Sequence, residues 1–233
     1  MARVAGPLEI PTMDARSPAV PHADSTWKRR VRVVLVRPEH AGNIGSAARA
    51  MKNLGFGALH LVAPACGHLT PDALKMAYGA GDVLEGARLH PSLIDAVGPA
   101  QWVAGFGMAR AGRPTLWLPE AGAGLAARSR ADDASEVALV FGPEISGLSN
   151  DDLAVCHQLI AIPTDTAQPS INLAQAVLLA CYELSRVPTP PASSPRDLAT
   201  AHEIDGLCAH LAETLDTIGF LFAPHDRHLV RDL

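Results

Sequence analysis

The chain alternates short, mostly apolar runs with longer stretches in which apolar residues recur every three or four positions. Apolar runs without strict alternation are typical of strands that are buried on both faces of a parallel sheet. Such runs predict strands over Val31–Val36, Ala58–Val62, Trp102–Phe106, Val137–Phe141 and Leu159–Ile162. The intervening pattern predicts helices over Ser46–Leu54, Pro91–Val97 and Asn172–Arg186, and helix starts at Thr70 and Ser149. This alternation predicts an α/β domain with a mainly parallel sheet flanked by helices.

Prolines and a change of pattern divide the chain into four parts. Residues 1–30 contain scattered prolines and no periodicity, which predicts a flexible N-terminal arm before a domain at residues 31–187. A Pro/Ser-rich linker follows at residues 188–196. Residues 197–233 are predicted to form a helical C-terminal extension with one apolar stripe. Because a single amphipathic helix cannot bury its own stripe, we expect it to pack on the domain or on another subunit.

Composition narrows the class of protein. The chain has 233 residues, 48% hydrophobic and 4% aromatic, and a formal net charge of −5. The apolar share is sufficient for a globular core, whereas the acidic balance counts against a general polyanion binder. Scattered cysteines without a CxxC pair favour a reduced, cytoplasmic setting. The sequence contains neither a run long enough to cross a membrane nor a recognisable set of metal ligands, so we expect no membrane and no metal partner.

Three polar segments follow predicted strands: Glu39–Phe56, Phe141–Leu148 and Ile162–Ala176. The carboxyl ends of parallel strands share one edge of the sheet, where open α/β sheets bind ligands. Taken singly, each segment also has a structural explanation. Arg49 lies on the polar side of its helix, like a surface arginine, and Glu144 fits a solvated turn. Ser170 fits a helix cap.

Together and in this order, the segments resemble the three signature motifs of the SpoU/TrmH family of RNA ribose 2'-O-methyltransferases, in the SPOUT superfamily. The matching residues are Asn43-x-Gly45-x-x-x-Arg49, Phe141-Gly142-x-Glu144-x-x-Gly147-Leu148, and Ile162-Pro163 with Ser170-Ile171-Asn172. The resemblance covers roughly residues 31–186 and is nearest to the TrmJ-type branch, which methylates nucleotide 32 of the tRNA anticodon loop. It implies a deep C-terminal trefoil knot, S-adenosyl-L-methionine as cofactor, and a homodimer with the active site near the subunit interface.

The resemblance also implies residue roles. Arg49 is the implied catalytic residue, with Asn43, Glu144, Ser170 and Asn172 ordering the site. The implied cofactor-binding residues are Phe106, Gly107, Met108, Gly142, Ile162, Pro169, Ser170 and Ile171. Because an arginine pKa above about 12 makes a guanidinium a poor base, we expect Arg49 to orient the phosphate neighbourhood and to stabilise the developing alkoxide.

The remaining expectations concern RNA. With few aromatics for base stacking, binding should depend on local arginines; the candidates are Arg29, Arg30, Arg32, Arg37, Arg110 and Arg113. The first three belong to a cluster that a solvated charge run before a strand also explains. Where the TrmJ-type pattern has Thr-Ser-Ala-Arg-x-Arg, this chain keeps two arginines at a shifted spacing within Phe106–Arg113. The expected substrate is tRNA; the alternatives are rRNA, another tRNA position, or an RNA-binding paralogue that no longer methylates.

Overall fold

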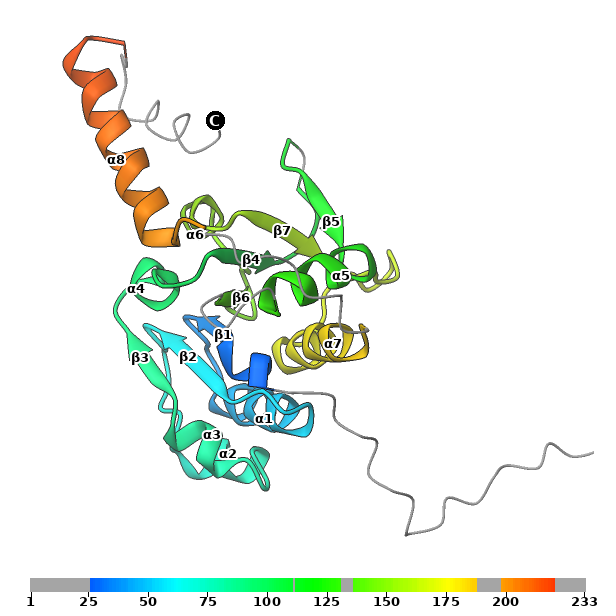
Figure 1. Ribbon diagram of the computed structural model, residues 1–233. Coiled ribbons are helices and arrows are strands. Elements are labelled where there is room, and N and C mark those ends of the chain that lie inside the picture. Colours follow the sequence, from blue (N-terminus) through cyan, green and yellow to red (C-terminus); the bar gives the residue numbers. More distant parts are fainter. Residues whose placement is uncertain (1–25, 111, 131–135, 188–197, 221–233) are drawn as a thin grey trace, which may run out of the picture.

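A seven-stranded sheet forms the centre of the protein (Figure 1). The computed structural model describes residues 26–110, 112–130, 136–187 and 198–220. The strand order is β3-β2-β1-β6-β4-β7-β5, and every neighbouring pair is parallel. The strands are β1 (Val31–Val36), β2 (Ala58–Val62), β3 (Arg88–His90), β4 (Trp102–Phe106), β5 (Thr115–Trp117), β6 (Val137–Phe141) and β7 (Gln158–Ala161). The predicted α/β fold with a parallel sheet is confirmed.

Helices cover both faces of this sheet. They are the 3-10 helix η1 (Thr26–Arg30), α1 (Ala41–Asn53), α2 (Pro71–Met76), α3 (Gly81–Glu85), α4 (Leu93–Val97), α5 (Leu118–Ser129), α6 (Asn150–Val155), α7 (Leu173–Arg186) and α8 (Ala201–Thr217). Alternate residues of β1 enter different cores: Val33 and Leu35 pack with α1, α5 and α7, whereas Val34 and Val36 pack with α4 and α6. The result is three layers, with α1 and α7 side by side on one face (Figure 1).

Most predicted elements are present, with shifts at their ends. The predicted strand Leu159–Ile162 is displaced by one residue to Gln158–Ala161. Helix α1 begins at Ala41, five residues before the predicted Ser46, so Asn43 and Gly45 lie on a helix and not on a loop. Their low helix propensity concealed this start. The sequence pattern missed β3, β5, α3 and α5.

The N-terminal boundary needs a correction. Residues 26–30, assigned to the flexible arm, form η1, and Trp27 is buried at 5% exposure. Its ring meets Phe56 edge-on, with 5.7 Å between ring centroids. Burial of an indole provides enough apolar contact to fix this turn on the domain. The rest of the predicted arm, the linker at 188–196 and residues 221–233 lie outside the described residues.

Helix α8 is the described part of the predicted C-terminal extension. Its first turn contacts the domain, because the Ala201 N–H donates to the Ala100 carbonyl (2.8 Å) and the His202 N–H donates to the Gly98 carbonyl (3.1 Å). Beyond that turn the helix projects away from the sheet (Figure 1). Leu207 is exposed along it. Within the described residues, the predicted apolar stripe is therefore largely exposed, with Leu211 and Ile218 exposed as well.

Helices α1 and α2 approach each other closely at Gly45. A Cβ atom at this position would lie 2.1 Å from the carbonyl oxygen of Ala73, which is far inside van der Waals contact. Only glycine allows this separation between the helix backbones. The contact fixes α2 and the turn after it against the outer side of α1.

Asp152 joins α6 to the carboxyl end of β1. Its carboxylate accepts hydrogen bonds from the Ser149 N–H (2.8 Å), the Ser149 hydroxyl (2.7 Å) and Nη1 of Arg37 (3.2 Å). Burial alone would raise the pKa of Asp152, but the hydrogen bonds from Arg37 and Ser149 outweigh it and hold that pKa below its ordinary value. The ionised carboxylate therefore stabilises the folded state.

Replacing Asp152 with asparagine should lower the free energy of unfolding by about 2 kcal/mol at pH 7, because it removes an ion pair and weakens a helix cap. A carboxylate whose pKa is lowered by folding contributes stability above its unfolded pKa of about 3.9, and loses it as pH falls through the folded value. Urea unfolding at pH 7 and at pH 2–3 measures this. The difference from wild type should shrink at the acidic pH, and Asp151→Asn, on the same turn but exposed, should show little effect. An equal loss at both pH values would contradict the assignment.

Candidate functional site

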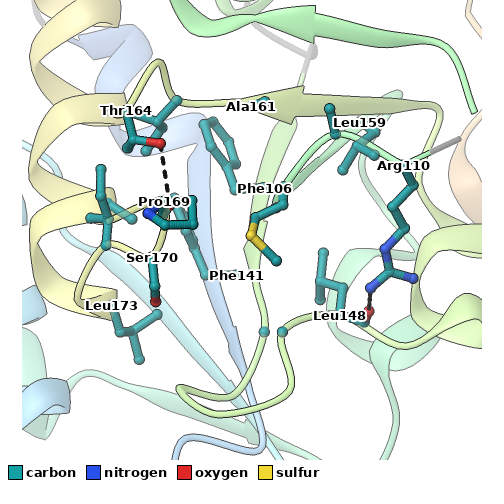
Figure 2. Close-up of a pocket in the computed structure, with 18 of the residues that line it drawn as sticks. Phe106, Arg110, Phe141, Leu148, Leu159, Ala161, Thr164, Pro169, Ser170 and Leu173 are labelled. Carbon is teal, nitrogen blue, oxygen red and sulfur yellow. Dashed lines mark hydrogen bonds between the residues drawn. The ribbon is translucent and has the colours of Figure 1, made fainter. Parts of the chain in front are cut away.

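A cavity of about 440 Å³ opens at the carboxyl ends of β4, β6 and β7 (Figure 2). Its wall is formed by the segments that follow these three strands. All eight residues predicted to bind the cofactor line it: Phe106, Gly107, Met108, Gly142, Ile162, Pro169, Ser170 and Ile171. The parallel sheet thus brings segments that are far apart in the sequence to one edge.

The cavity has an apolar floor and two opposed sides. Figure 2 shows Pro169 and Ser170 on one side, Leu148 and Leu159 on the other, and Phe106 between them. The ring of Phe106 stacks on Phe141 with 4.5 Å between centroids. This floor suits a flat, weakly polar group, while the exposed backbone of the surrounding loops offers hydrogen-bonding groups at the rim.

Two side chains hold the loops of this cavity in place. The Thr164 hydroxyl donates to the Pro169 carbonyl across the last loop (3.3 Å; Figure 2). Opposite, Arg110 donates through Nη2 to the Leu148 carbonyl (2.6 Å) and through Nη1 to Oδ1 of Asn150 (2.9 Å). Arg110, predicted as an RNA contact, therefore ties the loop after β4 to the loop after β6.

Gly142 begins a loop that doubles back on itself. A Cβ atom there would lie 2.3 Å from the carbonyl carbon of Gly147 and 2.3 Å from the backbone nitrogen of Leu148. Gly147 itself has a φ of +64°, in the left-handed region that favours glycine. The loop's own backbone therefore requires glycine at position 142, whatever contact that residue makes with a cofactor.

Glu144 anchors the amino-terminal end of α1. Its carboxylate accepts hydrogen bonds from the backbone N–H groups of Glu39 (2.9 Å) and His40 (3.2 Å) and from Nδ2 of Asn43 (2.7 Å). Burial raises the pKa of Glu144, but the hydrogen bonds from Asn43 and from these backbone groups outweigh it and keep the pKa below its ordinary value. The interpretation of Glu144 as a merely solvated turn carboxylate is therefore wrong.

Asn43 continues this network to the third motif. Its Oδ1 accepts from Nδ2 of Asn172 at 3.0 Å. Asn172 in turn caps α7, since its Oδ1 accepts from the N–H groups of Ala174 (2.9 Å) and Gln175 (3.4 Å). The helix cap suggested for Ser170 is thus provided by Asn172, and Ser170 instead lines the cavity. Three separate motifs are joined by the chain Glu144–Asn43–Asn172.

Arg49 lies apart from this network. It is exposed on α1 and is absent from the described wall of the cavity. Its guanidinium carbon lies 5.6 Å from the ring centroid of Tyr78, in the turn after α2. Of the five residues implied to be catalytic, the structure joins Asn43, Glu144 and Asn172, places Ser170 in the cavity wall, and leaves Arg49 exposed on α1, outside the described wall.

The six arginines predicted to contact RNA do not share one face. Arg29, Arg30 and Arg32 line a second cavity of about 300 Å³ at the amino-terminal ends of β1 and β2. Arg37 and Arg110 lie at the opposite, carboxyl-terminal edge. A strand of this length separates the two groups by roughly 20 Å.

Several of these arginines already have hydrogen-bond or ion-pair partners within the protein. Arg32 has only 11% of its side chain exposed and pairs with Glu136, through Nε at 2.6 Å. Arg37 pairs with Asp152. Carboxylates therefore offset both charges within the fold, and the role of Arg32 and Arg37 in contacting RNA stays a prediction. Arg30 donates to the Ser129 carbonyl (3.4 Å), Arg113 is half-buried, and Arg29 is exposed.

Several wall residues were missed by sequence reasoning. Trp117 belongs to β5, an edge strand too short to show a pattern, and it lines the cavity together with Asp165 and Thr166. The polar Thr/Asp content between Pro163 and Pro169 is the signal that could have marked the second pair.

Two further findings apply to the described ranges alone. They contain no helix long and apolar enough to span a bilayer. Nor do they contain three or more His, Cys, Asp or Glu side chains grouped so as to hold a metal ion.

Comparisons with known proteins agree with this geometry. The tRNA (cytidine/uridine/adenosine-2'-O-)-methyltransferase TrmJ of Pseudomonas aeruginosa is 37% identical over 217 residues, which cover 88% of this chain and 84% of that protein. The uncharacterized tRNA/rRNA methyltransferase LasT of Escherichia coli is 35% identical over 195 residues, covering 81% and 82%. The crystal structure of TrmJ from Z. mobilis superimposes with a TM-score of 0.73 at 33% identity, covering 86% of this chain and 88% of the other.

The parallel sheet, the cavity built by three loops and these similarities define a methyltransferase domain. More narrowly, the chain belongs to the SpoU rRNA Methylase family, whose model matches residues 30–182.

Proposed function

We propose that the protein transfers the methyl group of S-adenosyl-L-methionine to a ribose 2'-hydroxyl of tRNA, at nucleotide 32 of the anticodon loop. The observation that carries this proposal is that the second and third motif segments line one cavity, and that Glu144 and Asn172 join them to Asn43 of the first motif. The similarity to a protein named as a tRNA 2'-O-methyltransferase supports the choice of substrate. A tRNA substrate supports the further proposal that the protein is cytoplasmic.

The cavity fits the proposed cofactor. Its volume of about 440 Å³ lies within the ~300–1,000 Å³ of ordinary ligand sites. The apolar side chains of Phe106, Leu148 and Leu159 would hold the adenine, and the backbone around Gly142 and Ile171 would meet its polar edges. The bound sulfonium supplies an electrophilic methyl group, so alignment of the hydroxyl for in-line attack provides much of the rate.

Glu144 is unsuited to act as a general base. Three donors occupy its carboxylate, and its pKa lies below the ordinary value, which makes it a weak proton acceptor. We assign it the role of fixing the start of α1 relative to the loop after β6. Arg49 then has the electrostatic role: its cation orients the RNA backbone and stabilises the negative charge that develops on the 2'-oxygen as that oxygen takes the methyl group and releases its proton to water.

The proposal includes the knotted topology of this family. Strands β6 and β7 come late in the sequence, yet β6 lies between β1 and β4, and β7 lies between β4 and β5. Insertion of late strands among earlier ones is compatible with a chain that threads a loop, one of the rare exceptions to unknotted connections.

We also infer a homodimer. Arg49 stands outside the described wall of its own cavity, so a second protomer could complete the site. Apolar side chains of α7 are exposed, among them Leu178, Leu179 and Tyr182, and the stripe of α8 is also uncovered. Exposed apolar side chains that are neighbours along one helix, as these three of α7 are, are typical of an interaction site.

Methylation of bulk tRNA with labelled S-adenosyl-L-methionine, followed by mapping of the modified nucleotide, tests the function. We expect a single 2'-O-methyl group at nucleotide 32. Label in rRNA, or at another tRNA nucleotide, would support the alternative substrates, and the name of LasT gives the rRNA alternative some weight. A calorimetric titration without heat from the cofactor or its demethylated product would favour a non-catalytic RNA-binding protein.

A further inference from the structure

Tyr78 is an aromatic side chain displayed to solvent on a rigid turn. Its exposure is 77% in a protein with only 4% aromatic residues. The alanines on either side of this turn, Ala77 and Ala80, are buried, with exposed fractions of 1% each. The Ala77 N–H donates to the Ala73 carbonyl at 2.9 Å. Gly79 supplies a φ of +76°, which closes the turn. The backbone of Tyr78 is therefore held while its ring stays outside the core.

Packing of α2 on α1 places this ring beside Arg49. The two helices meet at Gly45, where no side chain fits beneath the Ala73 carbonyl. Arg49 follows Gly45 by four residues and so lies on the same face of α1, one turn further on. The turn that carries Tyr78 extends along this face, and the Arg49 guanidinium carbon lies 5.6 Å from the ring centroid.

We propose that Tyr78 is a positioning residue for Arg49. This inference rests on the proposed function of Arg49 in methyl transfer. The face of an aromatic ring attracts a guanidinium through its quadrupole within about 6 Å. The contact restricts a long, flexible side chain before the RNA binds, which lowers the entropy lost on reaching the reactive arrangement.

The kind of side chain that contacts an arginine decides whether its positive charge remains available. Arg32 and Arg37 pair with the carboxylates of Glu136 and Asp152, which neutralise them. Tyr78 holds Arg49 without supplying a negative charge, so the cation stays available for an alkoxide or a phosphate. At position 49 the aromatic partner therefore leaves the positive charge usable, whereas the charges of Arg32 and Arg37 face carboxylates.

Steady-state methylation by Tyr78→Ala, Tyr78→Leu and Tyr78→Phe tests this role. The first two should lower kcat by about three- to tenfold, with cofactor Kd and thermal stability at wild-type values because the ring is exposed. Tyr78→Phe keeps the π face and should restore wild-type kcat. In an Arg49→Ala background, Tyr78→Ala should add nothing. Leu89→Ala, which removes an exposed apolar side chain on β3, is the matched control.

A Tyr78→Ala enzyme with wild-type kcat would overturn the inference, as would a Phe variant as slow as the Ala variant. The NMR resonance of the Arg49 Nε–H group gives a readout that needs no turnover: it should shift in Tyr78→Leu and stay in place in Tyr78→Phe. If wild type fails to methylate RNA while this pattern holds, the proposed function is wrong and the positioning contact stands. If wild type is active and the resonance is indifferent to both changes, the inference about Tyr78 is wrong.

Discussion

Replacing Arg49 with alanine should lower kcat by about 10²- to 10³-fold while leaving the Kd of S-adenosyl-L-methionine unchanged. The magnitude is that of losing one preorganised charge at a developing oxyanion. Binding of the cofactor should survive because Arg49 is absent from the described wall of the cavity, and folding should survive because the side chain is exposed. Single-turnover methylation of tRNA together with calorimetry separates the two quantities. A parallel loss of cofactor affinity would contradict the assignment.

Two further variants distinguish a cationic role from proton abstraction. Arg49→Lys keeps the charge and should recover part of the rate, and that rate should fall as lysine loses its proton near a pKa of about 10.4. A rate that instead rises as this lysine becomes neutral would show that residue 49 acts as the base. Lys52→Ala, on the same helix but paired with Asp82 at 2.6 Å, controls for general loss of positive charge.

Sequence alone predicted the elements whose stability comes from their own burial. Every residue of Val137–Phe141 is apolar, as is every residue of Val31–Val36 except Arg32, and both strands have the expected bounds. The edge strands Arg88–His90 and Thr115–Trp117 were missed because exposed, polar-containing triplets become strands only by pairing with β2 and β7. Helix α5 was missed for a related reason: its glycines and alanines carry little periodicity, and its packing against α7 defines it.

The same distinction applies to the site. Three loops could be placed at one edge because parallel strands determine where their carboxyl ends lie. The fate of single arginines could not be predicted, because it depends on partners more than a hundred residues away. Arg32 meets Glu136 at a sequence separation of 104, and Arg37 meets Asp152 at 115. A residue's charge is visible in the sequence, whereas its neutralisation is a property of the fold.

Sequence alone also could not decide whether Ser170 or Asn172 caps helix α7. Both residues favour the N-cap position, so propensity does not separate them. The structure assigns the cap to Asn172, whose Nδ2 also reaches Oδ1 of Asn43. A contact with α1 therefore accompanies the cap at residue 172, and Ser170 is left at the cavity wall.

Gly142→Ala should abolish measurable cofactor binding at concentrations that saturate wild type, with a loss of unfolding free energy of about 2–4 kcal/mol. The added Cβ would lie 2.3 Å from the backbone at Gly147 and Leu148, and backbone atoms cannot move aside as the end of a flexible side chain can. Opening this loop would displace the wall that Leu148 forms and the hydrogen bond by which Arg110 holds it. Calorimetric titration and thermal unfolding measure both effects.

Gly107→Ala is the matched control, since Gly107 lines the same cavity but a Cβ there would make only an ordinary contact, 3.6 Å from Cδ1 of Leu159. Its unfolding free energy should stay near wild type. Any loss of cofactor affinity in Gly107→Ala must then come from the space the ligand occupies, whereas the loss in Gly142→Ala comes from the protein's own backbone. Wild-type stability in Gly142→Ala would refute the steric argument, because the added Cβ would then cause no strain in the loop. The pair therefore separates two reasons for glycine in one cavity: room for the ligand at position 107 and room for the chain at position 142.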